Sequence, residues 1–136
     1  MHKSSTVSNS EWIIMELLWV RPYTLMELVS ELYASIGWSK STVATMVRRM
    51  AEKGIITYTE KGRTKHFIPT ISRQDASMQQ TQSLLDRAFH GNVGQMVSTM
   101  AQAAPLTAAE INELYQILKK AEEELKCKKS SSHPLF

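Results

Sequence analysis

The stretch that decides the fold is Trp38-Ser39-Lys40-Ser41-Thr42-Val43-Ala44-Thr45-Met46-Val47-Arg48-Arg49-Met50-Ala51-Glu52-Lys53-Gly54. Its pattern predicts a helix that begins at the capping residue Ser39 and ends at Gly54. At 3.6 residues per turn, its apolar residues fall within about 100° of one another and are expected to face the core. They are Val43, Met46, Val47 and Met50.

The opposite side of this helix is polar and basic, and it carries side chains suited to DNA. An Arg can grip guanine through two hydrogen bonds, and a Thr methyl can contact thymine. The first turn of a groove-bound helix usually meets bases and phosphates. The candidate DNA-reading residues are therefore Ser41, Thr45 and Arg48 opposite the core, Thr42 and Arg49 on the flanks of that face, and Lys40 in the first turn. An ordinary amphipathic surface helix would show the same pattern, so the helix alone leaves that alternative open.

Two strand-like runs, residues 55–60 and 64–69, follow this helix directly. They are rich in β-branched and aromatic residues, and Gly62 lies between them, where a tight turn favours positive φ. The hairpin carries Lys61, Arg63 and Lys65, which in a wing would lie along the sugar-phosphate backbone. Alternatively, these charges only keep an exposed strand edge from aggregating. The pairing of helix and basic hairpin favours a winged helix.

Two further helices are predicted before this stretch. A capping box formed by Ser8 and Glu11 starts one helix near Ser10, and Arg21-Pro22 is expected to end it. Thr24 caps the next helix, which Gly37 closes. Its apolar stripe is Leu25, Leu28, Val29, Leu32 and Ile36. The expected fold is mainly α: a winged helix-turn-helix domain over residues 10–71, after a flexible tail of residues 1–9.

Three more helices are expected in residues 72–126, which we interpret as a helical dimerisation region. They run from Ser72 to Gly91, from Asn92 to Pro105, and onward from the capping box of Thr107 and Glu110. Their apolar faces need a surface to pack on, and a second copy of the chain is the simplest candidate. An intrachain bundle is the competing explanation. The predicted dimerisation residues are Leu84, Leu85, Phe89, Met96, Met100, Ile111, Leu114, Leu118 and Leu125. Residues 127–136 are expected to form a second flexible tail.

Charge is distributed unevenly along the 136 residues. The net charge is only +3, yet residues 40–73 hold eight Lys or Arg against two Glu, which is typical of a phosphate-binding surface. No apolar run approaches the roughly 18 residues that span a bilayer, and the polar amino terminus lacks a secretory signal pattern. Together with a single cysteine, this favours a cytoplasmic protein.

No pattern in the chain is typical of catalysis or of a cofactor site. A glycine-rich phosphate loop, a zinc-protease His pair and a nucleophile elbow are all missing from the sequence. We therefore predict neither an enzyme nor a bound cofactor. Metal sensing is an alternative, since Cys127 and His133 from two chains would supply four ligands, but thiolate sites normally show closely spaced cysteine pairs.

Several segments together resemble the BlaI/MecI/CopY, or penicillinase repressor, family of bacterial transcriptional repressors. The resemblance covers about residues 8–125 and is carried by the combination of motifs. These are residues 10–15 with Trp19, residues 38–45 with Arg49-Met50 and Lys53-Gly54, and Gly62-Arg63 leading to residues 67–69. It implies a homodimer that binds double-stranded DNA at an inverted-repeat operator and blocks transcription. A winged helix that holds a partner protein is the alternative from another class.

The resemblance also bears on how repression is released. In the β-lactam-responsive branch a protease cuts an Asn-Phe bond in the dimerisation region, and alignment through Gly91-Asn92 and Glu110-Ile111 puts this bond at Thr99-Met100. In the copper-responsive branch two Cys-x-Cys motifs bind the metal, whereas this chain offers only Cys127-Lys128-Lys129. A regulatory protease, another ligand or copper therefore stand as alternative signals.

Overall fold

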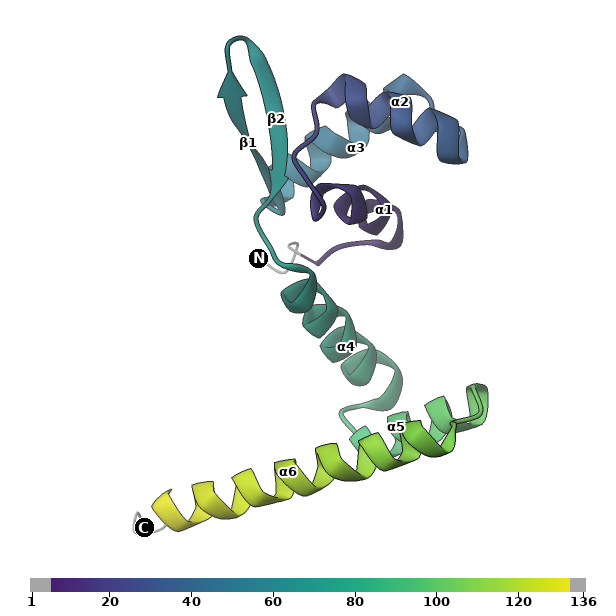
Figure 1. Ribbon diagram of the computed structural model, residues 1–136, viewed down its shortest axis with the longest axis vertical. Helices are drawn as coiled ribbons and strands as arrows, with labels where there is room; N and C mark the ends of the chain where they lie inside the picture. Colours follow the sequence, from purple (N-terminus) through teal and green to yellow (C-terminus); the bar gives the residue numbers. More distant parts are fainter. Residues whose placement is uncertain (1–5, 133–136) are drawn as a thin grey trace. The chain divides into compact units, whose positions relative to one another are not determined.

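A computed structural model of the chain describes residues 6–132 and divides into two compact units, the first ending at His90 and the second beginning at Gly91. The first unit contains six of the elements in Figure 1: α1 (Asn9–Leu18), α2 (Leu25–Ile36), α3 (Lys40–Lys53), β1 (Ile56–Lys61), β2 (Thr64–Pro69) and α4 (Arg73–Phe89). The second unit contains α5 (Val93–Ala103) and α6 (Ala108–Ser132). No helix within the described range combines the length and apolar character needed to cross a membrane.

Local capping explains where the helices begin. Ser8 and Glu11 form the predicted capping box of α1, and Thr24 and Glu27 form another at α2. Ser39 accepts a hydrogen bond from the Thr42 backbone N–H at the start of α3. Each cap satisfies a backbone donor that the first helical turn leaves without a partner. Helices α2 and α3 end as predicted, at Gly37 with φ +75° and at Gly54 with φ +84°.

The first helix ends earlier than predicted. Helix α1 stops at Leu18, with Trp19 as its C-cap, rather than at Arg21-Pro22. The Trp19 indole N–H donates to the Ile71 carbonyl over 2.9 Å, and its ring lies edge-on to Trp12 at 5.2 Å between centroids. Trp19 is therefore held by the segment that leads into α4, a contact that no local pattern in the sequence reveals.

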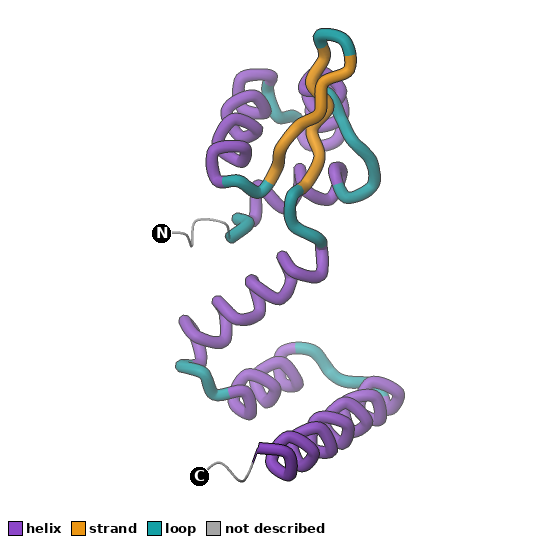
Figure 2. Tube along the Cα trace, turned by 90° about the vertical axis from the view of Figure 1, so that its left-hand side faces the viewer, coloured by secondary structure: helices purple, strands orange, loops and turns teal. Residues whose placement is uncertain are grey.

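The two strands pair antiparallel, with Ile56 opposite Pro69 and Lys61 opposite Thr64. Two residues form the turn, and the first, Gly62, has φ +68°, as the tight hairpin turn requires. Tyr23 adds an isolated bridge to the other edge of β2, exchanging hydrogen bonds with Phe67 of 3.3 and 2.8 Å. The hairpin, orange in Figure 2, extends away from the start of α4. This arrangement confirms the predicted winged helix.

The core of the first unit lies between α1, α2, α3 and the base of the hairpin. Its buried apolar residues come from these elements, the segments beside them and the start of α4: Val7, Ile14, Met15, Leu18, Tyr23, Leu28, Leu32, Val43, Val47, Met50, Ile55, Ile56, Phe67 and Ala76. Met46 is partly buried against them, so the inward face predicted for α3 is confirmed. Ile36 differs from its prediction, because it lies in the last turn of α2 and is 45% exposed.

The predicted tail of residues 1–9 differs from the structure in its described part. Val7 is buried, and α1 begins at Asn9. The N-terminal half of α4 packs on the rest of the first unit, where Ala76 is buried and Arg73 pairs with Glu16 at 2.6 Å. The division after His90 therefore falls one helix later than the predicted boundary after residue 71.

The second unit consists of two helices with local caps. Asn92 accepts a hydrogen bond from the Gln95 N–H, and Thr107 and Glu110 form the predicted capping box with bonds of 2.9 and 3.1 Å. Helix α6 continues to Ser132, past the end predicted at residue 126. The run 119–128 has high helix propensity through its Lys, Glu, Ala and Leu residues, which explains the extension.

Candidate nucleic-acid interface

The outer face of α3, its flanks and its first turn present the six residues predicted to read DNA. Five are exposed and Thr45 is half-buried, while Val43, Val47 and Met50 fill the opposite side. The exposed residues are Lys40, Ser41, Thr42, Arg48 and Arg49. The core thus fixes which side of the helix is offered to a partner, and that side is polar and cationic.

At the beginning of α3 the hydroxyl groups are organised around the cap. The Ser39 Oγ atom lies 3.2 Å from the Ser41 Oγ atom and donates to the Thr42 Oγ1 atom over 3.0 Å. It also accepts from the Thr42 backbone N–H at 3.2 Å. This network holds the first turn in one arrangement, with Lys40 exposed beside it.

The two arginines of α3 differ in their surroundings. Arg48 lies 3.5 Å from Glu52 in an i,i+4 pair whose side chains are both mostly exposed. Such a surface pair contributes little to stability and can be exchanged for another anion. Arg49 forms no hydrogen bond or ion pair within the described part of the chain. Both guanidinium groups are therefore available to a polyanion.

The wing carries its cations on either side of the turn. Lys61 ends β1, Arg63 occupies the second turn position, and Lys65 lies opposite Glu60 in the hairpin register. All three are exposed. The Lys65 ammonium lies 4.5 Å from the centroid of the Tyr58 ring, a cation–π contact that orients this lysine on the strand surface.

A groove of about 720 Å³ lies between the wing, α3 and the start of α2. Its wall brings Arg48 of α3 together with Arg63 and Lys65 of the wing, over an apolar floor that includes Leu25, Met26, Val47, Tyr58 and Phe67. The other six predicted DNA-contacting residues do not line this groove. The structure thus joins the two predicted contact elements along one concave surface.

One carboxylate beside this groove has an altered titration. The pKa of Glu27 is lowered, chiefly because its side chain accepts a hydrogen bond from the Thr24 backbone N–H. The neighbouring Arg21 guanidinium, 3.4 Å away, acts in the same direction. The capping box of α2 and Arg21 therefore already stabilise the ionised Glu27 carboxylate.

Two of the eight cations counted in residues 40–73 face other parts of the first unit. Lys53 forms an ion pair with Glu11, with 2.6 Å between the Nζ and Oε1 atoms. Arg73 pairs with Glu16, and its guanidinium lies 4.8 Å from the centroid of the Trp19 ring. The Arg73 hydrogen bond is the main reason why the pKa of Glu16 is lowered and that of Arg73 is raised.

The number of Lys and Arg residues in a segment does not distinguish exposed side chains from those that form ion pairs within the first unit. Position 53 follows Met46 by seven residues and Met50 by three, so helical periodicity puts Lys53 on the side of the core. That spacing was the available signal for Lys53. For Arg73, which begins α4, no comparable signal exists, because its partner lies 57 residues away in the sequence.

The predicted dimerisation residues fall into two groups. Leu84, Leu85 and Phe89 belong to α4 in the first unit, and the other six belong to α5 and α6. Most are substantially exposed. Met96 and Leu114 are half-buried, whereas Met100, Ile111, Leu118 and Leu125 are exposed.

The residues considered for cleavage or metal binding lie in the second unit. Thr99 and Met100 are exposed within α5, and the Met100 carbonyl accepts the Ala104 N–H at 3.1 Å. Cys127 is a free, exposed thiol on α6, and His133 lies outside the described residues. Within those residues, no group of three or more His, Cys, Asp or Glu is placed to hold a metal ion.

Comparison with known proteins shows which family the chain is similar to. The model of the penicillinase repressor family matches residues 7–120. The penicillinase repressor of Bacillus licheniformis is 32% identical over 119 residues, covering 87% of this chain and 93% of that protein. The methicillin resistance regulatory protein MecI of Staphylococcus aureus is 22% identical over 120 residues, covering 88% and 98% respectively.

A solved structure gives a further similarity. The solution structure of the DNA-binding domain of the repressor BlaI matches with a TM-score of 0.49 and 29% sequence identity, over 55% of this chain and 93% of that domain. The family model spans most of the chain, and the Bacillus licheniformis relative exceeds 30% identity over nearly its whole length. The chain therefore belongs to the penicillinase repressor family.

Proposed function

We propose that this chain is a transcriptional repressor that binds an inverted-repeat operator in double-stranded DNA as a homodimer. Family membership supports the coarser statement that it is a DNA-binding repressor. The observation that carries the proposal is the outer face of α3, where exposed Arg, Lys, Ser and Thr side chains lie on a helix whose other side is fixed by the core.

In this proposal α3 enters the major groove and the wing follows the backbone. Arg48 and Arg49 are the residues suited to grip a base, because a guanidinium donates two parallel hydrogen bonds to guanine. Lys61, Arg63 and Lys65 neutralise phosphates and so contribute affinity on any sequence. The groove that joins Arg48 to Arg63 and Lys65 supports a single continuous contact surface.

Dimerisation is proposed to occur through the second unit and the end of α4. Exposed apolar side chains along α5 and α6 include Val93, Val97, Met100, Ile111, Leu118 and Leu125. Water contact with so many apolar side chains is unfavourable, and a second copy of the chain would cover them. Two copies related by two-fold symmetry would present half-sites about 10 base pairs apart, or a multiple of this distance.

Release of repression is proposed to act on the second unit, because separating the protomers removes the gain from binding two half-sites at once. Cleavage at Thr99-Met100 by a regulatory protease would act in this way. Proteases prefer exposed flexible segments, so cutting within α5 would require that helix to open locally. Binding of a ligand, including copper at Cys127, is the alternative signal.

A titration of the purified chain against the DNA upstream of its own gene tests the proposal. We expect specific binding to exceed binding to a shuffled sequence of equal composition by at least about 10³-fold. Footprinting should reveal a protected palindrome. Equal affinity for both DNAs at several salt concentrations would contradict it, and negligible affinity for either would favour a protein-interaction module. Repeating the titration with copper, zinc or the β-lactam-pathway protease separates the release signals.

A further inference from the structure

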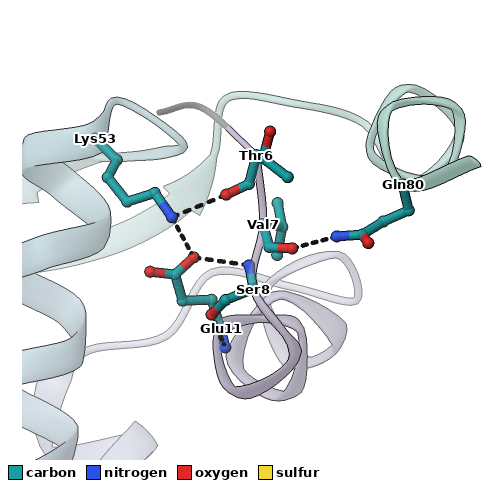
Figure 3. Close-up of polar contacts among 6 residues, drawn as sticks. All are labelled: Thr6, Val7, Ser8, Glu11, Lys53 and Gln80. Atoms are coloured by element: carbon teal, nitrogen blue, oxygen red, sulfur yellow. Dashed lines mark hydrogen bonds and ion pairs between the residues drawn. The ribbon is translucent and has the colours of Figure 1, made fainter. Parts of the chain in front are cut away.

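The segment before α1 is held between the end of α3 and the middle of α4 (Figure 3). The Lys53 ammonium donates to the Thr6 carbonyl over 2.8 Å, and the Gln80 amide donates to the Val7 carbonyl. Between these two contacts the Val7 side chain is only 1% exposed. Residues 6–8 therefore connect the last residue of α3 to a helix that follows the wing.

Glu11 is the centre of this arrangement. Its Oε1 atom accepts the Ser8 backbone N–H at 3.0 Å and lies 2.6 Å from the Lys53 Nζ atom. The Glu11 backbone N–H in turn donates to the Ser8 hydroxyl at 3.2 Å. One carboxylate thus closes the first turn of α1 and pairs with the last residue of α3.

The pair is largely shielded from water, with the Glu11 side chain 10% exposed and that of Lys53 25% exposed. Taking two charges out of water is costly, so such an ion pair need not add net stability. Replacing either residue by a neutral one leaves the charge of the other without an ionic partner. The ion pair therefore fixes the position of the C-terminal end of α3 relative to α1.

Arg49 lies one helical turn before Lys53, is exposed, and flanks the outward side of the same helix. A small rotation or shift of this end of α3 would move the Arg49 guanidinium relative to a base edge. Base readout depends on hydrogen-bond geometry, whereas phosphate contact tolerates displacement. The ion pair therefore bears on sequence reading although neither partner faces the outer side.

We infer that Glu11 is a positioning residue for DNA reading, which acts through Lys53 to hold the recognition helix, and that Lys53 is not a phosphate contact. This inference rests on the proposed function, since it assigns a role in the same site. It also removes Lys53 from the cationic surface that the sequence alone would assign to DNA.

Four variants of the full chain test the inference. Glu11→Gln removes the charge but keeps an acceptor for the capping box, and Lys53→Met keeps the aliphatic stem. Lys53→Arg keeps the cation. Glu16→Gln is the matched control, because it breaks another 2.6 Å ion pair of α1, with Arg73, that does not involve α3.

Affinity for the operator is measured over a range of salt concentrations, at a temperature where circular dichroism shows each variant folded. Glu11→Gln and Lys53→Met should each weaken operator binding at least about fivefold, the lower end of the effect of losing a base contact. The double variant should be no weaker than the weaker single variant, because both remove one interaction. Lys53→Arg and Glu16→Gln should bind like the wild type.

The salt dependence separates positioning from phosphate contact. Removing one phosphate contact makes the negative slope of log K against log salt shallower by about 0.9. We expect Lys53→Met to leave the slope unchanged. A reduced slope for Lys53→Met with wild-type affinity for Glu11→Gln would overturn the inference, as would wild-type affinity for both folded variants. A wild-type chain that does not discriminate operator from random DNA contradicts the proposed function instead.

Discussion

The two units of the chain differ in how much of their apolar surface they bury themselves. The first unit encloses fourteen buried apolar residues in one core, from Val7 to Ala76. In the second unit no described residue of α5 or α6 is buried, and Tyr115, Leu118 and Leu125 are each more than half exposed. Burial of apolar surface is the main force that stabilises a fold.

The local signals for helix formation are the same in both units. The capping box of Ser8 and Glu11 at α1 has a counterpart in Thr107 and Glu110 at α6. Capping decides where a helix begins, whereas packing of an apolar face decides whether it persists. The comparison indicates that the first unit folds on its own core, whereas the second depends on a further surface, which we propose to be a second copy of the chain.

The largest effect is expected from the core of the first unit. Leu28→Ala removes a fully buried side chain and should lower the free energy of unfolding by about 2–5 kcal/mol. Trp12, Trp19 and Trp38 all lie in this unit, so tryptophan fluorescence during urea unfolding reports on it specifically. A decrease below about 1 kcal/mol would show that the core does not carry the stability of this unit.

Arg49→Ala sharpens the comparison by separating function from folding within the first unit. Because Arg49 is exposed and forms no hydrogen bond or ion pair within the described residues, the free energy of unfolding should be unchanged. Specific binding should weaken by about 1–3 kcal/mol if the guanidinium grips a base. Competition binding with operator and random DNA measures this, and equal weakening on both would indicate that Arg49 does not read bases.

The wing should give smaller effects that are independent of sequence. Lys61→Ala or Arg63→Ala should weaken binding to operator and random DNA alike, and each should reduce the salt slope by about 0.9 if its side chain neutralises one phosphate. Fluorescence anisotropy at several salt concentrations provides the measurement. If either substitution changed the preference for operator over random DNA, the wing would take part in base readout.

The smallest effect is expected from the ion pair between α1 and α4. Because Arg73 lowers the pKa of Glu16 in the folded chain, this carboxylate stabilises the fold above its unfolded pKa of about 4.3 and loses that contribution as the pH falls through the folded value. Both side chains are about half exposed, so solvent screens the pair and the gain in stability is small. The difference in melting temperature between the wild type and Glu16→Gln should be largest near neutral pH and shrink in acid. A constant difference would contradict the linkage.

The sequence predicted the features of this molecule that are determined locally. Capping residues, terminal glycines and the apolar stripe of α3 all lie within a few positions of the element that they define, so the winged helix followed from them. The partners of Lys53 and Trp19 could not be predicted in the same way, because Glu11 and Ile71 are 42 and 52 residues away in the sequence. The outer face of α3 was predictable because it is simply the side that the core residues leave free.

Sedimentation velocity of the full chain at micromolar concentration tests the central claim most directly, with Leu118→Asp as the matched variant. We expect the molar mass obtained for the wild type to be twice the chain mass of 15.4 kDa. Leu118→Asp, which places a charge on the exposed apolar face of α6, should sediment as a monomer with the tryptophan fluorescence of its first unit unchanged. A wild-type chain that sediments at 15.4 kDa would contradict the proposed dimer.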